Sequence, residues 1–284
     1  MSIEKLYVVG SGAMGSGIAQ TAATCGLKVT MNDISRELVE KGYAKIKKSL
    51  EKSVTKGRMT EEDKDKALAN LKITVALEDA ADADFVIEAA TENSSIKLDI
   101  FSRLDKICKP EAVLASNTSS IPITEIAAAT ERPEQVVGTH FFNPVPAMKL
   151  LELIVGHVTS EETFRRAEEL GEILGKVTVK SIDKGGFIVN RLVDPFINEA
   201  VFMLEEGVGT AEDIDKGCQF GLNHPMGPLA LGDMIGWDVM LAVMEVLYAE
   251  YGDPKYRPAP LMRRMVRAGH LGVKTGKGIY EYNK

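Results

Sequence analysis

From residue 6 to residue 182, short apolar runs alternate with longer segments in which apolar residues recur at every third or fourth position. The short runs predict buried strands, and the longer segments predict amphipathic helices. Expected strands lie at residues 6–9, 28–33, 71–75, 85–87, 113–115, 136–138, 150–155 and 176–179, and expected helices include 16–25, 96–107 and 160–174. This alternation predicts a doubly wound α/β fold with a mostly parallel sheet, whose ligands bind at the carboxyl ends of the strands.

A pair of helices interrupts this alternation after the second strand. The first helix carries an apolar stripe from Tyr43 to Val54 and ends at Gly57. Thr60 with Asp63 then resembles a capping box, which predicts the start of a shorter second helix. We therefore expect a helical hairpin inserted into the sheet domain.

The opposite face of the first of these helices is strongly basic. Between residues 41 and 58 only Glu51 offsets a set of cations, namely Lys41, Lys45, Lys47, Lys48, Lys52, Lys56 and Arg58. A solvated helix face accounts for most such runs of charge. A surface that binds the phosphate-rich part of a ligand would use the same residues, and the pattern alone leaves both interpretations open.

Strand patterns disappear after residue 186. Helical patterns follow at 189–205, 211–220 and 234–251. We therefore expect two domains: residues 1–184 with the sheet, and residues 185–284 as an all-α domain. In the second domain, Val201, Met240 and Val243 belong to a set of apolar positions larger than one small core needs, so we expect a surface for self-association.

Composition narrows the classes of partner and compartment. The 284 residues carry a formal net charge of −7, which argues against nucleic acid as the main partner. Cys25, Cys108 and Cys218 are odd in number and far apart, as suits reduced thiols in a cytoplasmic protein. The first strand begins too close to Met1 for a signal peptide, and no apolar run reaches membrane-spanning length.

A glycine-rich turn follows the first strand and opens a helix. Its sequence is Gly10-Ser11-Gly12-Ala13-Met14-Gly15. Backbone N–H groups at a helix N-terminus bind a pyrophosphate, and the three glycines allow the turn, the approach of the phosphates and close helix packing. Asp33 follows the second strand roughly twenty residues on, where a carboxylate binds the ribose hydroxyls of NAD and repels the 2′-phosphate of NADP. Arg36 lies close enough to weaken that preference.

One histidine lies where the chemistry of this fold is expected. His140 follows a strand on the cofactor side, and Glu152 lies on the next strand, so a hairpin would bring the two together. A carboxylate on one imidazole nitrogen fixes the tautomer and supports proton uptake at the other. A hydrogen-bonded loop histidine is the alternative. No spacing typical of a metal site occurs.

Two further polar residues could bind a substrate oxygen. Ser119 and Asn190 offer a hydroxyl and an amide to an oxygen whose charge changes during a reaction. A helix cap for Ser119 and a polar helix contact for Asn190 are equally consistent with the sequence. A nucleophilic serine is not favoured, because there is no Gly-x-Ser-x-Gly elbow.

Taken together, these residues resemble those of the L-3-hydroxyacyl-CoA dehydrogenase family, and most closely its bacterial 3-hydroxybutyryl-CoA dehydrogenases. The resemblance runs from the glycine turn to the last residues. Its most specific stretches are Val86-Ile87-Glu88-Ala89, Ser116–Ser120, His140-Phe141-Phe142-Asn143-Pro144, residues 183–200, residues 224–232 and Gly272–Tyr282. The resemblance implies a Rossmann-type NAD domain and the reversible, NAD-dependent oxidation of an (S)-3-hydroxyacyl-CoA to a 3-ketoacyl-CoA.

The resemblance also implies residue roles. His140 would be the general acid/base, paired with Glu152, while Ser119 and Asn190 would bind substrate oxygens. Besides the glycine turn and Asp33, the family positions that touch NAD are Glu92, Lys97, Ser119, Asn143 and Lys274. Those that touch CoA are Ser49, Lys56 and Ser119.

Two rival functions and four departures from the family pattern remain. The rivals are a dehydrogenase of a hydroxy acid without CoA, and a non-catalytic, crystallin-like NAD-binding protein. The departures are Gly185 where proline is usual, Asp194 where an apolar residue is usual, Trp237 where leucine is common, and the atypical segment Thr91–Ile96, although Glu92 and Lys97 keep their spacing. None removes a residue with an implied role, and we expect a homodimer or a larger homo-oligomer.

Overall fold

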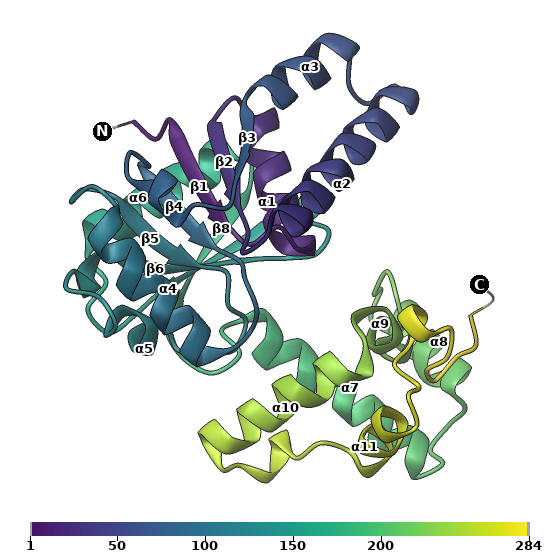
Figure 1. Cartoon of the computed structure of the whole chain (residues 1–284). Coiled ribbons are helices and arrows are strands. Elements are labelled where there is room, and N and C mark those ends of the chain that lie inside the picture. The colour runs from purple at the N-terminus through teal and green to yellow at the C-terminus, as the bar shows by residue number, and fades with distance from the viewer. Residues whose placement is uncertain (1, 283–284) are drawn as a thin grey trace. The chain divides into compact units, whose positions relative to one another are not determined.

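The computed structural model describes residues 2–282, and the chain forms two compact units, residues 1–184 and 185–284. The first unit is built on one sheet of eight strands in the order β3-β2-β1-β4-β5-β6-β7-β8. The strands are β1 (Lys5–Val9), β2 (Lys28–Asn32), β3 (Leu71–Thr74), β4 (Phe85–Glu88), β5 (Val113–Ser116), β6 (Val136–Phe141), β7 (Leu150–Val155) and β8 (Val177–Ile182). The Rossmann-type sheet expected from the sequence is confirmed (Figure 1).

Neighbouring strands are parallel except at one position. Strands β6 and β7 pair in antiparallel register, so β7 and β8 run against the rest of the sheet. The strand order reverses direction between β1 and β4, and ligands of open α/β sheets bind outside the carboxyl ends of the strands at such a point. Residues of β1, β4 and β5 are buried along nearly their whole length, as expected for strands covered on both faces.

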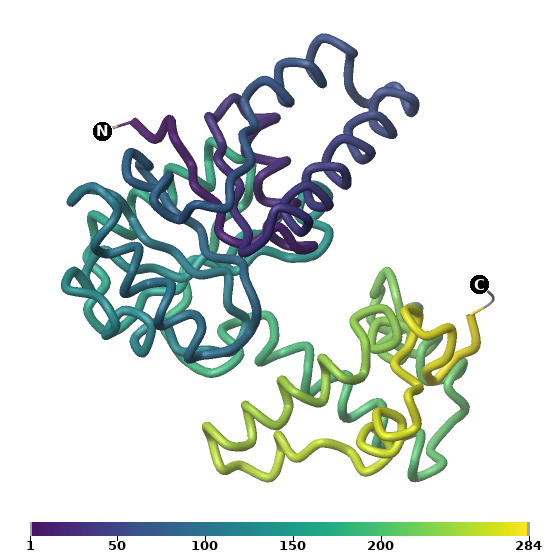
Figure 2. The backbone as a smooth tube through the Cα atoms, viewed as in Figure 1, coloured from purple at the N-terminus to yellow at the C-terminus, as the bar shows by residue number. Residues whose placement is uncertain are grey.

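Helices connect the strands of this unit. They are α1 (Ala13–Thr24), α2 (Arg36–Thr55), α3 (Glu61–Ala69), α4 (Ser94–Ile107), α5 (Ile123–Ala127) and α6 (Glu161–Ile173), with 3₁₀ turns at Leu77–Ala80 and Pro133–Gln135. Helices α2 and α3 form the expected hairpin, which projects from the sheet in Figure 1. The backbone of the two helices and of the turn between them can be followed in Figure 2. Ile46 and Leu50 of α2 are buried, and the Thr60 hydroxyl caps α3 by accepting from the Asp63 N–H.

The second unit is helical. It contains α7 (Val189–Glu205), α8 (Ala211–Gly221), α9 (Pro228–Ile235), α10 (Trp237–Tyr251) and α11 (Pro260–Arg267), with 3₁₀ turns at Pro254–Tyr256 and Val273–Thr275. The prediction of a single helix at 234–251 is wrong at its start, because α9 ends at Ile235 and α10 begins at Trp237. Gly236 adopts a φ of 105°, which side-chain-bearing residues rarely accept, and it separates α9 from α10. Met234 therefore belongs to α9.

Three apolar residues that suggested self-association lie inside this unit. Val201, Met240 and Val243 are all buried in its own core, so none of them offers a surface to a partner. The prediction that they are surplus is wrong, because an apolar residue on a helix does not reveal which neighbour covers it. Among the described residues, no helix has both the length and the apolar content needed to cross a lipid bilayer.

Candidate active site and ligand-binding surfaces

The glycine turn leaves room for a dinucleotide. A Cβ on Gly10 would lie 2.5 Å from the Ala89 carbonyl oxygen, and one on Gly15 would lie 1.9 Å from the Gly10 carbonyl oxygen, so both positions require glycine. Gly12 has open space around it and provides no side-chain cap for α1. The N–H groups that begin α1 therefore have no side-chain acceptor at this turn, and the backbone fits a pyrophosphate.

Asp33 lies beside this turn and is held in place. Its Oδ2 accepts from the Ser11 backbone N–H at 2.8 Å and from the Ser11 hydroxyl at 2.5 Å, and its Oδ1 accepts from the Ile34 N–H at 2.8 Å. Arg36, the residue that weakened the preference for NAD, has its Nε 2.7 Å from Glu40 Oε1. The arginine is thus engaged by a carboxylate of its own helix, while Asp33 is fixed beside the glycine turn.

A buried ion pair supports the loops that follow β4 and β5. Lys97 is 1% exposed, and its ammonium donates to both carboxylate oxygens of Glu88 at 2.8 Å. Glu88, which is fully buried, also accepts from the Ser116 hydroxyl at 2.7 Å and from the Ala90 N–H at 2.7 Å. Lys97 therefore acts within the protein as a support for these loops, and the structure places its ammonium away from the surface.

Glu92 connects that ion pair to the Ser119 loop. Its Oε2 lies 3.5 Å from the Lys97 ammonium, and its Oε1 accepts from the N–H groups of Ser119 at 2.9 Å and Ser120 at 3.1 Å. Although burial raises the pKa of Glu92, the charge of Lys97 and the hydrogen bonds from residues 118–120 lower it below its ordinary value. Glu92 is thus an ionised acceptor that organises residues 118–120.

His140 and Glu152 meet as the sequence predicted. They face each other in the antiparallel β6–β7 pair, and His140 Nδ1 lies 2.6 Å from Glu152 Oε2. Both are buried. Strand β6 is longer than expected, so His140 lies within the strand rather than after it. The Asn117 side-chain oxygen accepts from the Phe141 N–H at 3.0 Å, which ties the end of β6 to the Ser116–Ser120 loop.

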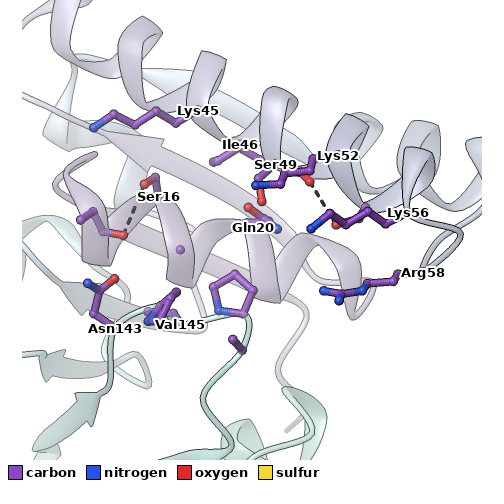
Figure 3. Close-up of a pocket in the computed structure, with 16 residues that line it drawn as sticks. Ser16, Gln20, Lys45, Ile46, Ser49, Lys52, Lys56, Arg58, Asn143 and Val145 are labelled. Atoms are coloured by element: carbon purple, nitrogen blue, oxygen red, sulfur yellow. Dashed lines mark hydrogen bonds between the residues drawn. The ribbon is translucent and has the colours of Figure 1, made fainter. Parts of the chain in front are cut away.

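A trough lies between α1, α2 and the segment 143–147, and we call it the α1–α2 trough. Its volume is about 650 Å³. One wall comes from α1, one from α2 and the residues just after it, and one from the segment 143–147. The lining residues are, in that order, Ala13, Ser16, Gly17 and Gln20; Lys45, Ile46, Ser49, Lys52, Ser53, Lys56 and Arg58; and Asn143, Pro144, Val145, Pro146 and Ala147. Figure 3 shows Asn143 and Lys45 toward one end and Lys56 with Arg58 toward the other. Ser49 and Lys56, the expected CoA residues, both line this trough.

Two expected ligand residues belong to the helical unit. Asn190 lies in the first turn of α7 and is partly buried. Lys274 lies in the 3₁₀ turn Val273–Thr275, and its ammonium bonds the carboxylate of Asp238. Buried Asp233 holds the end of the chain by accepting from the N–H groups of Ile279 at 2.8 Å and Tyr280 at 2.9 Å. His224 lies in the loop between α8 and α9, with its ring 5.5 Å from that of Phe196.

Two residues that support or line these surfaces were not predicted from the sequence. Glu88 appeared only as part of a motif, although an acidic residue at the end of a wholly apolar strand signals a buried partner such as Lys97. Gln20 received no role, because a lone glutamine on a helix has no characteristic spacing. Both residues become meaningful only when their neighbours are known.

Comparisons with known proteins agree along the whole chain. The family model described as 3-hydroxyacyl-CoA dehydrogenase, NAD binding domain, matches residues 5–184, and that of the 3-hydroxyacyl-CoA dehydrogenase C-terminal domain matches residues 186–282. A 3-hydroxybutyryl-CoA dehydrogenase of Clostridioides difficile is 50% identical, with 99% of this chain and 100% of that protein covered. A probable 3-hydroxybutyryl-CoA dehydrogenase of Bacillus subtilis is also 50% identical, with 100% and 99% covered. The crystal structure of (S)-3-hydroxybutyryl-CoA dehydrogenase PaaH1 from Ralstonia eutropha has a TM-score of 0.97 at 52% identity, with both chains fully covered.

Proposed function

The chain belongs to the 3-hydroxyacyl-CoA dehydrogenase family, and on that premise we propose that it reversibly oxidises (S)-3-hydroxybutyryl-CoA to acetoacetyl-CoA with NAD. NAD, when bound, accepts the hydride that leaves C3 of the substrate. The glycine turn and Asp33 hold the dinucleotide, and the Arg36–Glu40 pair supports the choice of NAD over NADP. The family match and the fit of the glycine turn both support this cofactor.

His140 is the residue that moves the proton. Because a carboxylate can only accept, Glu152 keeps the hydrogen of His140 on Nδ1, and the neutral ring then presents its lone pair on Nε2. Nε2 takes the hydroxyl proton as the C3 hydride leaves, and Glu152 balances the imidazolium that results. In the reverse direction the same nitrogen returns the proton to the ketone oxygen. The buried His140–Glu152 pair is the observation that carries this mechanism.

The other site residues bind and orient. Ser119 hydrogen-bonds the substrate from a loop that Glu92 and Lys97 hold in place. Asn190 binds a substrate oxygen, while Asn143 and Lys274 contact NAD. Ser49 and Lys56 contact CoA from the α1–α2 trough. We also propose that the enzyme is cytoplasmic, in keeping with its three unpaired cysteines. We propose further that it forms a homodimer or a larger homo-oligomer, in keeping with the large apolar side chains exposed on the helical unit.

A substrate and cofactor panel tests the proposal. NADH oxidation is followed at 340 nm with acetoacetyl-CoA, a longer 3-ketoacyl-CoA and free acetoacetate, and then with NADPH in place of NADH. We expect turnover with NADH and acetoacetyl-CoA, and much weaker turnover with acetoacetate or NADPH. Preference for acetoacetate would favour a dehydrogenase of a hydroxy acid without CoA. NADH binding without any turnover would favour a non-catalytic protein.

A further inference from the structure

Cations gather at one end of the α1–α2 trough, whereas Lys45 is the cation that lines its other end. Lys52, Lys56 and Arg58 make no ion pair among residues 2–282, whereas Lys64 and Lys66 of the neighbouring α3 are paired with glutamates of their own helix. Three cations without a carboxylate partner favour an anionic ligand at that end. The proposed substrate carries its phosphates on the nucleotide half of CoA, which fits this end of the trough.

A different kind of group lies between the two ends. Gln20 is 8% exposed and lines the trough from α1, and in Figure 3 its side chain points from α1 toward Ser49 on α2. Ile46 and Val145, which also line the trough, are buried. The middle of the trough therefore combines apolar walls with one carboxamide.

That carboxamide has no hydrogen-bond partner among the described residues. The other polar side chains on α1 all have such a partner. The hydroxyls of Ser16, Thr21 and Thr24 donate to backbone carbonyl oxygens three or four residues earlier, at 2.6, 2.8 and 2.8 Å. Because Gln20 lines the trough and its amide makes no hydrogen bond within the described protein, this amide offers both a donor and an acceptor to whatever enters the trough. A secondary amide is the complementary group, because it also has one donor and one acceptor.

We propose that Gln20 recognises the amide-bearing pantetheine arm of CoA, by accepting from an amide N–H and donating to an amide carbonyl of that arm. This inference rests on the proposed function, since it assumes a CoA thioester as substrate. Gln20 lies nearly two helical turns beyond Ala13, at about 1.5 Å of rise per residue, and so is well separated from the glycine turn. Gln20 is thus a substrate-binding residue that acts on the thioester and not on NAD.

Three acetoacetyl thioesters separate this role from a structural one. The CoA thioester has both amides and nucleotide, the pantetheine thioester keeps the amides alone, and the ethyl thioester has neither. Gln20→Leu replaces the amide with an apolar group, and Gln20→Met is a second variant with an unbranched chain. Thr24→Val on the same helix is the matched control, because Thr24 does not line the trough.

We expect both Gln20 variants to raise the KM for the CoA and pantetheine thioesters about fivefold to tenfold, as the loss of one or two net hydrogen bonds would. The kcat, the KM for NADH and the kcat/KM for the ethyl thioester should not change, and Thr24→Val should match the wild type. Arg58→Ala should affect the CoA thioester alone. Equal losses on all three thioesters, or no loss on any, would overturn the role of Gln20.

Binding measurements separate this inference from the proposed function. Calorimetric titration with CoA and with pantetheine needs no turnover, so it remains informative even if acetoacetyl-CoA is not reduced. Absence of turnover by the wild type would refute the proposed function. Binding of both compounds that is as tight to Gln20→Leu as to the wild type would refute the inference about Gln20.

Discussion

At the residue scale, the contacts of single carboxylates decide most of the chemistry. Glu152 fixes the tautomer of His140, Glu92 orders the Ser119 loop, and Asp33 is locked to the glycine turn by Ser11. Each of these carboxylates only accepts hydrogen bonds, so the group that faces it must be the donor. Three separate carboxylates therefore hold the proposed proton-transfer site, the Ser119 loop and the proposed ribose site in place.

The preference for NAD can be shifted by two substitutions. Asp33→Ala removes the charge that would repel a 2′-phosphate, so we expect a higher KM for NADH and a smaller ratio of NADH to NADPH turnover. Adding Glu40→Gln releases Arg36 from its ion pair, and we expect the double variant to use NADPH better than Asp33→Ala alone. Glu37→Gln, in the same turn of α2, is the control. An unchanged cofactor ratio in the double variant would contradict this account.

Asp194 predicts an unusual dependence of stability on pH. Burial raises the pKa of this carboxyl to about 7, and its Oδ2 has no hydrogen-bond partner among the described atoms. Because the pKa is about 3.9 in an unfolded chain, stability is full below that value, falls as the pH rises from there to about 7, and is constant above it. Asp194→Leu should therefore stabilise the protein more at pH 8 than at pH 5, by about 3 kcal/mol at most. Urea unfolding at both pH values measures this, and an equal effect at both would be inconsistent with a buried titrating carboxyl.

At the element scale, buried charge supports the loops at the carboxyl end of the sheet. Lys97 of α4 reaches back to Glu88 at the end of β4, and the Ser116 hydroxyl at the end of β5 donates to the same carboxylate. One ion pair thus joins two strands and a helix at the edge where the site lies. The network accounts for a lysine whose ammonium is buried, because Glu88 balances its charge.

Breaking this ion pair should be costly. Lys97→Met leaves Glu88 charged and buried without a cation, and we expect a loss of about 3–5 kcal/mol of unfolding free energy. Glu88→Gln combined with Lys97→Met removes both charges and should recover part of that loss. Chemical denaturation of the single and double variants gives the coupling energy. Additive losses would mean that the two side chains do not act as a pair.

Two glycines of the helical unit should respond oppositely to alanine. Gly236 has a φ of 105°, and a Cβ there would lie 2.8 Å from the Lys274 ammonium, so Gly236→Ala should destabilise the protein by about 1 kcal/mol or more. Gly217 lies exposed within α8 with open space around it, so Gly217→Ala should stabilise the protein by about 1 kcal/mol. Thermal unfolding of both variants tests this contrast. A Gly236→Ala variant as stable as the wild type would show that the backbone of Gly236 is not constrained, and a destabilised Gly217→Ala variant would contradict the prediction for α8.

At the scale of the whole molecule, the sequence predicted the sheet and the pairing of His140 with Glu152 because both follow from strand spacing. It missed the break at Gly236, since apolar residues continue on both sides of that glycine. It also misread Val201, Met240 and Val243, whose burial depends on how several helices pack. The role of Gln20 could not be predicted for the same reason. The trough that this residue lines is formed with α2 and segment 143–147, and both are distant from Gln20 in sequence.

The oligomeric state is a prediction for the whole molecule. Phe220, Leu192 and Leu222 on the helical unit are 84%, 70% and 59% exposed, and large exposed apolar side chains favour association. We expect light scattering to give about twice the chain mass of 30.9 kDa, or a higher multiple, at micromolar concentration. A monomer under those conditions would refute self-association.

The proton-transfer role of His140 is the central claim, and steady-state NADH oxidation with acetoacetyl-CoA by the wild type and His140→Ala tests it most directly. We predict that the variant loses about 10²–10⁴-fold in kcat, as expected when a general acid/base is removed, while its affinity for NADH, measured by fluorescence titration, is unchanged. A variant that reduces acetoacetyl-CoA as fast as the wild type would contradict the account.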